Sequence, residues 1–324
     1  MWNNRWILGV AAIALGAAAA ALIGSGTALS LMSQALIYAL FATGVGLLLK
    51  QNGMVSFGHA MYFGGAGYLV ALLLQTRAMP GELVILATLA IVAVFAFLLG
   101  LIVVRVPGIA FGMLTLAVGQ MFYLTAARSR GSLGDADGIN IEWPASLFNV
   151  PLATLSKPAG MFLASWITLV ITLVLLSWVL SRRFGGITEA VRDNEERARF
   201  IGIRTLLPRA MLFALSGVVT ALAGVLSALN TGFVSPENLH WSVSGVALMM
   251  VVVGGVRELW GPALGATVYF LAKDVLGDFA SHWMAIFGIA LIVVIVFWPH
   301  GMAGALLRLV GKGRAAPAAR AGGH

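Results

Sequence analysis

Side chains able to do chemistry are few in this sequence and lie far apart. It has five histidines and no cysteine, which excludes disulfides and thiolate metal sites. The His-Glu-x-x-His pair of zinc hydrolases and the Gly-x-x-x-x-Gly-Lys-Ser/Thr loop of nucleotide hydrolases are both missing. Residues 135–138, Asp-Ala-Asp-Gly, lack the later glutamate of a calcium loop. We therefore expect a protein that is not an enzyme and holds no metal or cofactor.

One stretch combines polar side chains with glycines that interrupt an apolar segment. Asn52, Ser56 and His59 lie within or beside this break, in residues 51–67. Irregular backbone at membrane depth is tolerated only where protein or a water-filled cavity satisfies its polar groups. The stretch is therefore a candidate solute path. The alternative is that the glycines only permit close helix packing, that Ser56 bonds to its own helix, and that His59 is a neutral buried or interfacial imidazole.

A second stretch, residues 188–202, is densely charged, and its order predicts a short helix. Thr188 is a suitable N-cap, Glu189 places an anion in the first turn, and Gly202 offers a stop. Opposite charges stand four residues apart at three places: Arg192–Glu196, Asp193–Arg197 and Glu195–Arg199. The other face is small and weakly apolar: Ala190, Val191, Asn194, Ala198 and Ile201. Such a helix suits docking against another protein; the alternative is a solvated connector that touches nothing.

The elements that must position these residues are membrane helices. Sixty per cent of the 324 residues are hydrophobic and ten per cent are charged, whereas a soluble domain has about 25% charged residues. Apolar runs of about twenty residues recur, long enough to cross a hydrocarbon core about 30 Å thick. We predict an all-α polytopic integral membrane protein with about ten transmembrane helices, at residues 6–24, 29–49, 57–76, 83–104, 109–127, 161–180, 209–230, 243–256, 262–277 and 282–298.

The positions of the cations predict the orientation. With the amino and carboxyl termini both cytoplasmic, few of the twenty lysines and arginines lie outside: Arg77, Arg128, Arg130, Lys157 and Lys273. The transmembrane domain covers residues 1–306, with an extracytoplasmic loop at 128–160 and a cytoplasmic loop at 181–208. Residues 307–324 form a basic, disordered cytoplasmic tail that suits an anionic inner leaflet. The first segment resembles a signal peptide. It must be retained, however, because removing one of the ten spans would reverse the side on which the later loops lie.

A face of small residues follows the charged loop. Its members recur every four residues: Ser216, Thr220, Gly224 and Ala228. In lipid such a face lets two helix backbones approach closely. Packing within the chain is the expected use, and a subunit contact is the alternative.

Several of these stretches resemble the branched-chain amino acid permease family of ABC importers. Residues 53–60, Gly-Met-Val-Ser-Phe-Gly-His-Ala, run on to residues 64–68 and are similar to the family's Gly-Gln-x-Ser-x-Gly-His-Ala segment. Residues 108–117, together with Gln120, are similar to the segment that marks its M-type subunit, LivM.

The second half of the chain carries the resemblance further. Residues 232–237, 253–255 and 259–265 are similar to the family's second-half signature. Residues 188–202 look like its coupling-helix loop, in a variant spacing. The matches follow one another in order, so the set is specific although each one alone is weak.

The resemblance implies the translocation subunit of an ABC importer in the bacterial inner membrane, carrying a small polar solute such as a branched-chain or related amino acid. It implies a second permease subunit in a heterodimer, two cytoplasmic ATPase subunits and an extracytoplasmic solute-binding protein as partners, within a lipid bilayer and without nucleic acid. It also implies a solute path formed by Asn52, Ser56, His59, Gly64, Thr115 and Gln120. The implied ATPase-coupling residues are Glu189, Ala190, Arg192, Asn194, Ala198 and Gly202.

At one position the chain departs from the family pattern, because Met54 stands where the family usually has glutamine. Urea, short amides and aromatic acids are therefore alternative solutes. From the residues alone a self-sufficient secondary transporter or channel also stays open, although ionisable residues at mid-span, the mark of ion-coupled carriers, are scarce. A membrane enzyme is disfavoured because no catalytic cluster appears in the predicted loops.

Overall fold

The structure is a computed structural model that describes residues 3–106, 108–129, 137–279, 288–289, 292 and 301–309. Within these residues the chain is mainly helical, as predicted. Each predicted span that ends before residue 279 has a helix at its place. The predicted span 282–298 falls mostly outside the described residues, and the part of the tail from residue 310 onward falls entirely outside them.

The helices of the first half are α1 (Asn3–Leu22), α2 (Gly26–Asn52), α3 (Ala60–Gln75), α4 (Gly81–Val103), α5 (Ile109–Arg128), α6 (Leu152–Leu155) and α7 (Pro158–Leu180). Those of the second half are α8 (Arg183–Asp193), α9 (Glu195–Phe200), α10 (Leu206–Thr231), the 3-10 helix η2 (Pro236–Leu239), α11 (Trp241–Gly254), α12 (Gly261–Phe279) and α14 (Gly301–Leu309).

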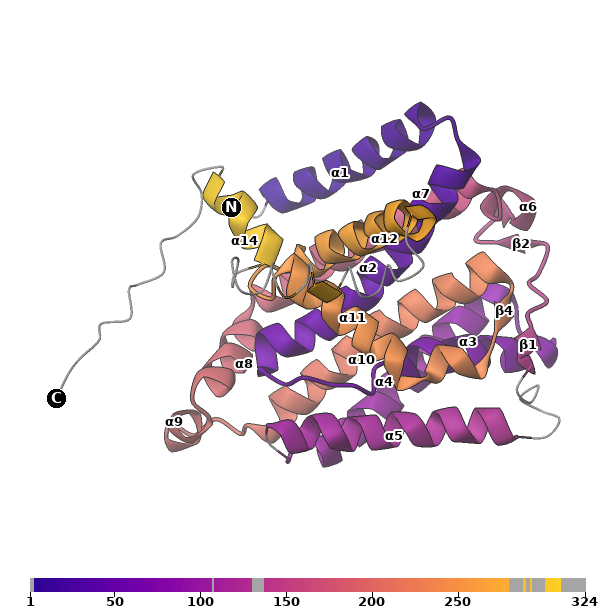
Figure 1. The fold of residues 1–324 in the computed structure, drawn as a ribbon. Helices are drawn as coiled ribbons and strands as arrows, with labels where there is room; N and C mark the ends of the chain where they lie inside the picture. Colours follow the sequence, from indigo (N-terminus) through magenta and orange to yellow (C-terminus); the bar gives the residue numbers. More distant parts are fainter. Residues whose placement is uncertain are drawn as a thin grey trace.

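Two small antiparallel sheets lie at the end of the molecule opposite α8 and α9 (Figure 1). Strand β1 (Ile139–Asn140) pairs with β4 (Phe233–Val234), with Ile139 opposite Val234. Strand β2 (Ser146–Leu147) pairs with β3 (Val150–Pro151), with Leu147 opposite Val150. The first sheet joins the loop before α6 to the segment after α10, so it links the two halves of the chain.

Glycine and proline set several helix ends. Gly53 and Gly232 follow α2 and α10 with φ angles of +66° and +65°, a left-handed conformation that a residue with a Cβ rarely adopts. Pro80 precedes α4, and Pro158 is the first residue of α7, where a missing N–H leaves no helical hydrogen bond unmade. Glycine or proline therefore lies at each of these four helix ends.

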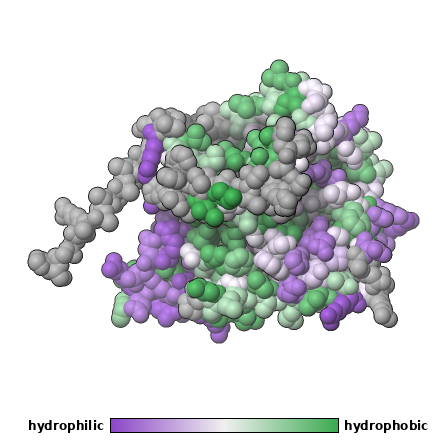
Figure 2. Space-filling view, in the orientation of Figure 1, coloured by the Kyte–Doolittle hydropathy of each residue, from purple (hydrophilic) through white to green (hydrophobic). Residues whose placement is uncertain are grey.

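Among the described helices, five are long and apolar enough to cross a membrane: α2, α4, α5, α7 and α10. Shorter apolar segments accompany them at Gly9–Leu22 of α1, in α3 and in α11. Figure 2 shows hydrophobic surface across the middle of the molecule and hydrophilic residues gathered over α8 and α9 at one end. The chain is therefore an all-α membrane protein.

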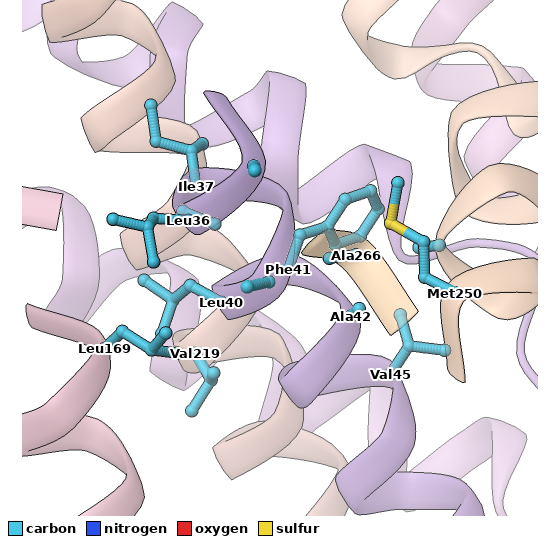
Figure 3. Close-up of a cluster of buried hydrophobic side chains, with 14 of the residues drawn as sticks. Leu36, Ile37, Leu40, Phe41, Ala42, Val45, Leu169, Val219, Met250 and Ala266 are labelled. Carbon is cyan, nitrogen blue, oxygen red and sulfur yellow. The ribbon is translucent and has the colours of Figure 1, made fainter. Parts of the chain in front are cut away.

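Helices α2 and α10 form the centre of the bundle. In their most apolar windows 78% and 72% of the residues are buried, compared with 22% in α4 and 28% in both α5 and α7. Leu40 and Phe41 of α2 share one buried cluster with Leu169 of α7, Val219 of α10 and Met250 of α11 (Figure 3). Helices α2 and α10 are therefore enclosed, whereas α4, α5 and α7 each carry exposed apolar side chains such as Val94, Met113 and Leu175.

Candidate functional site

Residues 53–59 connect α2 to α3 without helical structure and hold the first candidate site. Helix α3 begins at Ala60 rather than at residue 57, where the predicted span starts. Gly53 turns the chain at the end of α2, and a Cβ added there would lie 3.3 Å from the Cγ atom of Arg192 in α8. The predicted break is confirmed, but it lies at residues 53–59, whereas the predicted spans place it at residues 50–56.

His59 is fully buried and joins three elements through its ring. Its Nδ1 lies 2.8 Å from Ser56 Oγ, and its Nε2 lies 2.6 Å from Ser216 Oγ in α10. The Ser216 hydroxyl donates to the carbonyl oxygen of Gly44 in α2 at 2.6 Å. The Ser216 hydroxyl proton is used in its bond to Gly44, so Ser216 Oγ accepts a hydrogen bond from His59 Nε2–H. His59 Nδ1 then carries no proton and accepts from the Ser56 hydroxyl. The chain of hydrogen bonds therefore assigns the neutral Nε2–H tautomer to His59.

This chain of hydrogen bonds lies deep in the bundle. At 1.5 Å per residue, Gly44 is about 12 Å from the end of α2 at Asn52, and Ser216 is about 15 Å from the start of α10 at Leu206. Both positions therefore lie well inside helices that are long enough to cross a hydrocarbon core about 30 Å thick. Non-helical backbone inside such a bundle needs partners within the protein. The N–H of Gly53 donates to the carbonyl oxygen of Leu49 in α2, and the N–H of Gly58 donates to the Ser56 hydroxyl.

Helix α5 presents a groove of small residues to this segment. A Cβ added to Gly58 would meet the carbonyl oxygen of Thr115, and one added to Gly119 would lie 3.2 Å from Gly58 Cα. A Cβ on Gly112 would lie 3.1 Å from the carbonyl oxygen of Val55. The Thr115 hydroxyl donates to the Gly112 carbonyl oxygen of its own helix at 2.9 Å. Thr115 therefore contributes close backbone contact, while its hydroxyl is used within α5.

Helices α3 and α11 begin beside each other. The backbone N–H of Ala60 donates to Ser244 Oγ at 2.7 Å. His240 caps α11, because its Nδ1 accepts from the N–H of Ser242 at 3.4 Å. From this meeting point α3 extends toward β1 and β4, whereas α11 extends toward α14 (Figure 1). Discontinuous helices that begin inside the bilayer are typical of transporters, which build solute sites between them.

The other predicted path residues lie apart from the His59 chain. Asn52 donates through Nδ2 to the carbonyl oxygen of Arg209 at 3.3 Å, at the α8–α9 end of the bundle. Gln120 is half-buried on α5, and within the described part of the chain its amide oxygen, like that of Asn52, has no hydrogen-bond partner. Gly64 packs on η2, where a Cβ would lie 2.8 Å from the backbone of Asn238. The structure thus brings together only Ser56, His59 and Thr115 of the predicted set.

A cavity of about 340 Å³ opens between α3, α4 and α5. The aromatic ring of Tyr62 lines it and also packs edge-on against His59, with centroids 5.7 Å apart. The buried hydroxyls of Tyr62 and Tyr68 have no hydrogen-bond partner among the described residues. The other walls are mainly apolar and include Ile91, Phe95, Phe122 and Leu239. An apolar cavity with a few polar groups is the usual form of a small-molecule site.

The second candidate site, residues 188–202, is not the single helix that the sequence predicts. Asn194 has extended backbone angles, φ −159° and ψ 102°, and divides the segment into α8 and α9. Thr188 lies inside α8 and is not its N-cap, because α8 begins at Arg183. Asn194 is the capping residue, since its side chain accepts from the N–H of Arg197 at 2.8 Å. An asparagine that caps a helix satisfies N–H groups that have no partner within the helix.

The break changes the predicted ion pairs. Glu195 and Arg199 pair as expected, at 2.6 Å. Arg192 instead contacts Asp193, at 2.8 Å. The predicted pairs of Arg192 with Glu196 and Asp193 with Arg197 would span the break at Asn194, where the spacing of four residues no longer brings two side chains together.

The predicted stop at Gly202 is confirmed. Its φ is +85°, and its N–H donates to the carbonyl oxygen of Arg199 at 2.9 Å. The N–H of Ile203 donates to the carbonyl oxygen of Ala198 at 3.0 Å. These two bonds with a left-handed glycine form a Schellman motif, which ends a helix without leaving its last carbonyl groups unpaired.

The sequence also predicts that small residues form one docking face on this segment, and this prediction is wrong because they do not form a continuous exposed surface. Val191 and Ala198 are buried against the chain itself, whereas Ala190 and Asn194 are exposed. The exposed apolar surface lies at the end of α9, where Phe200 is 90% and Ile201 72% exposed. Sequence reasoning missed Phe200, although an aromatic residue just before a helix stop in a charged loop is a signal that it could have used.

Helices α8 and α9 are fastened to the bundle at two points. At α2, the Thr188 hydroxyl donates to Gln51 Oε1 at 2.8 Å, and Arg192 Nη1 donates to the carbonyl oxygen of Lys50 at 2.5 Å. At α10, Arg209 Nη1 lies 2.5 Å from Glu195 Oε2. The predicted coupling residue Glu189 adds a bond to the first point, accepting from Gln51 Nε2 at 3.3 Å.

The second of these points is centred on the carboxylate of Glu195. Burial raises the pKa of Glu195, but a hydrogen bond from Thr205 and the charges of Arg209 and Arg199 outweigh it and hold the pKa below its ordinary value of 4.5. The carboxylate is therefore ionised at neutral pH. Among the described residues, no group of three or more histidine, aspartate or glutamate side chains could hold a metal ion.

The fold and these sites define a helical membrane transport protein, in which discontinuous helices meet inside the bundle and a charged segment is fastened to one end. The chain belongs to the family described as branched-chain amino acid transport system / permease component, which matches residues 27–296.

Two kinds of curated relative show this similarity. One is the high-affinity branched-chain amino acid transport system permease protein LivM of Escherichia coli (strain K12), 23% identical over 313 residues that cover 90% of this chain and 73% of the relative. The other is the autoinducer 2 import system permease protein LsrC of Salmonella typhi, 34% identical over 183 residues that cover 52% of each chain. No solved structure shows a significant match to this chain.

Proposed function

We propose that this chain is the translocation subunit of an ABC importer, which carries a small polar solute inward while separate subunits hydrolyse ATP. It would pair with a second permease subunit in a complex that contains two ATPase subunits, contact an ATPase subunit through α8 and α9, and receive solute from a binding protein at the opposite end. In this proposal α8 and α9 are cytoplasmic, in a bacterial inner membrane. Family membership supports the general role, and the geometry of α8 and α9 supports the coupling.

The observation that carries this proposal is the exposed apolar end of α9 on an otherwise anchored segment. Phe200 and Ile201 stand 90% and 72% exposed, whereas Ala198 beside them is buried. A short helix held by ion pairs at its start, with an aromatic residue at its end, is suited to entering a groove of another protein. Aromatic anchors of this kind contribute most of the affinity at protein interfaces.

The anchors also give a route for force. A push on α9 is passed to α10 through Glu195 and Arg209, and to α2 through α8 and Lys50. Helices α2 and α10 meet again inside the bundle, where His59 and Ser216 join them to the non-helical residues 53–59. Movement of α2 against α10 would therefore displace this segment and the adjoining wall of the cavity lined by Tyr62.

The test is ATPase docking in the complex reconstituted with its ATPase subunits, second permease and solute-binding protein. Phe200→Ser combined with Ile201→Ser should weaken co-purification of the ATPase subunits by about tenfold or more, as expected for an interface hot spot. Solute-stimulated ATP hydrolysis should fall with it. Phe148→Ser is the matched control, because Phe148 is an exposed aromatic residue, 64% exposed, near the other end of the molecule.

The ATPase subunits should co-purify with the Phe148→Ser complex as they do with the wild type. Unchanged docking and unchanged stimulation in the double variant would contradict the assignment of α9 as the ATPase-docking helix. A wild-type chain that transports solute without any ATPase subunit would favour a self-sufficient transporter. Ala198→Trp is unsuitable for this test, because Ala198 is 2% exposed and a tryptophan there would disturb the chain's own packing.

For the solute, we propose a branched-chain or related amino acid, with urea, short amides and aromatic acids as alternatives. The relative LivM is named for branched-chain amino acids and the relative LsrC for autoinducer 2, so permeases of related sequence serve different solutes. The cavity between α3, α4 and α5 supports a solute with an apolar part, since its walls are mainly apolar. We propose that Gln120, together with the His59 segment, borders the path beside this cavity.

Filling the cavity tests the path. Gly65 lines it, and a Cβ added there meets nothing within 4 Å. Gly65→Leu should therefore leave folding intact and lower solute uptake severalfold. Gly245→Leu is the control, because a Cβ on this α11 glycine also meets nothing within 4 Å and Gly245 does not line the cavity. Normal uptake by Gly65→Leu, at normal protein levels, would place the path elsewhere.

A further inference from the structure

A second pocket lies where α4, α9 and the start of α10 come together, at the α8–α9 end of the molecule. It has a volume of about 360 Å³ and is lined by Arg105, Arg199, Arg209, Glu195 and Thr205, among others. Three arginines face one carboxylate, so the pocket has an excess of positive charge. Guanidinium groups in this number favour an anion, above all phosphate, which they bind through paired N–H donors.

Some of the arginine N–H donors in this pocket are not paired with an acceptor among the described residues. Glu195 engages one nitrogen each of Arg199 and Arg209, at 2.6 and 2.5 Å. The Nε of Arg209 is buried and has no hydrogen-bond partner among the described residues, although the Arg209 side chain is only 13% exposed. Arg105, two residues after α4, is exposed, and its Nε donates to the carbonyl oxygen of Leu101 in α4 at 2.9 Å. An unsatisfied buried donor beside an exposed arginine is a reason to expect a ligand.

The surroundings of the pocket indicate what kind of anion it takes. Along α4, an exposed apolar stripe recurs at helical spacing and leads directly to Arg105: Ile91, Val94, Leu98 and Ile102. Near the start of α10, Leu207 and Met211 are also exposed, at 40% and 48%. The pocket therefore stands where an apolar surface gives way to a charged one, which is the depth of lipid headgroups. Basic pockets of this kind between membrane helices suit anionic headgroups.

We infer that this pocket binds the phosphate of an anionic phospholipid, through Arg105, Arg209 and Arg199, with an acyl chain along the exposed stripe of α4. The assignment to the cytoplasmic leaflet rests on the orientation proposed above; the binding itself does not. The bound phosphate would share Arg199 and Arg209 with Glu195, the residue that anchors α9. Occupancy of the pocket would thus make the attachment of α9 depend on the lipid composition of the membrane.

The experiment uses the full chain, purified in mild detergent and titrated with phosphatidylglycerol or with phosphatidylcholine, with retained lipid counted by native mass spectrometry. Phosphatidylglycerol should be retained in preference to phosphatidylcholine. Arg105→Gln should lower its retention about fivefold, the loss expected for one basic residue at a membrane surface, and Arg105→Lys should restore part of it. The control is Arg204→Gln, which changes an exposed arginine at the same end that does not line the pocket.

Two further arms separate a lipid from a soluble anion. Inorganic phosphate at millimolar concentration should not displace phosphatidylglycerol, because free phosphate has no chain to place on the α4 stripe. Ile102→Asn should weaken retention without changing the charge of the pocket. Equal retention by Arg105→Gln and Arg204→Gln would overturn the site, and full displacement by inorganic phosphate would overturn its assignment to a lipid. A matched melting temperature for each variant shows that a loss of lipid is not a loss of fold.

Discussion

Two adjacent glycines of α3 differ in what lies opposite their missing side chains. A Cβ on Gly64 would lie 2.8 Å from the backbone of Asn238, whereas a Cβ on Gly65 meets nothing within 4 Å. Gly64→Ala should therefore destabilise the protein, because about 1–3 kcal/mol of overpacking outweighs a helix-propensity gain of about 1 kcal/mol. Gly65→Ala should gain the same helix propensity without overpacking, so it should not destabilise the protein. Thermal unfolding in detergent should give a lower melting temperature for Gly64→Ala than for Gly65→Ala.

The two variants can be compared directly, because each adds one methyl group to the same helix at neighbouring positions. Equal melting temperatures for the two variants would mean that η2 moves away from α3 without a penalty. In that case the close contact at Gly64 does not position the start of α11.

Also at the residue scale, the polar cluster around His59 was partly predictable. Ser56 and His59 lie three residues apart in a glycine-broken apolar stretch, and the sequence predicts both as members of one solute path; the structure shows that their side chains are in contact. Their partner Ser216 is 157 residues from His59 in the sequence. It was expected only as a member of a small-residue packing face. Local spacing indicates that a polar group in an apolar segment needs a partner, but it does not identify a partner on another helix.

At the scale of the element, the anchoring of α9 depends on one ionised carboxylate. The pKa of Glu195 is lower in the folded protein than its ordinary value of 4.5. Its stabilising contribution is therefore complete above pH 4.5 and is lost as the pH falls through the lower folded-state pKa. A spin label at Arg197→Cys, an exposed position of α9, should become more mobile over that acidic range. No native cysteine competes for the label.

Neighbouring carboxylates supply the comparison for this experiment. In a Glu195→Gln background the label should be mobile at neutral pH and should no longer respond to acid. Glu196→Gln changes an exposed neighbour and should keep the wild-type pH response. An acid response that persists in Glu195→Gln would assign the anchor of α9 to another group.

The helices themselves show where prediction at the element scale succeeds and where it fails. The stop at Gly202 was predicted correctly, because a left-handed cap is a local property of glycine. The break at Asn194 was not, because three ion pairs at helical spacing favoured a continuous helix. Each exposed pair contributes only about 0.2–0.5 kcal/mol, so the contacts of Glu195 with Arg209 and Thr205 outside the segment decide the outcome.

At the scale of the whole molecule, the proposed orientation predicts which ends face which compartment. Lys157, before α7, and Arg197, in α9, are exposed at opposite ends of the bundle. In spheroplasts, an impermeant maleimide should label Lys157→Cys directly and Arg197→Cys only after the membrane is opened. Because the chain has no cysteine, an unmutated sample gives the background. Labelling of both variants from the same side would rule out the proposed topology.

The sequence by itself determined the class of this protein, the places of its described membrane helices and many of their ends. Apolar runs, helix-breaking residues and charge clusters are local properties of the sequence. The thickness of the hydrocarbon core sets the length that a spanning helix needs, so these properties suffice to locate the spans. Only the tertiary structure decided that His59 is buried against α10 and Gly58 against α5, and that Phe200 rather than Ala198 is exposed. Those outcomes depend on contacts between distant segments, and in an apolar chain many alternative packings share the same hydrophobic pattern.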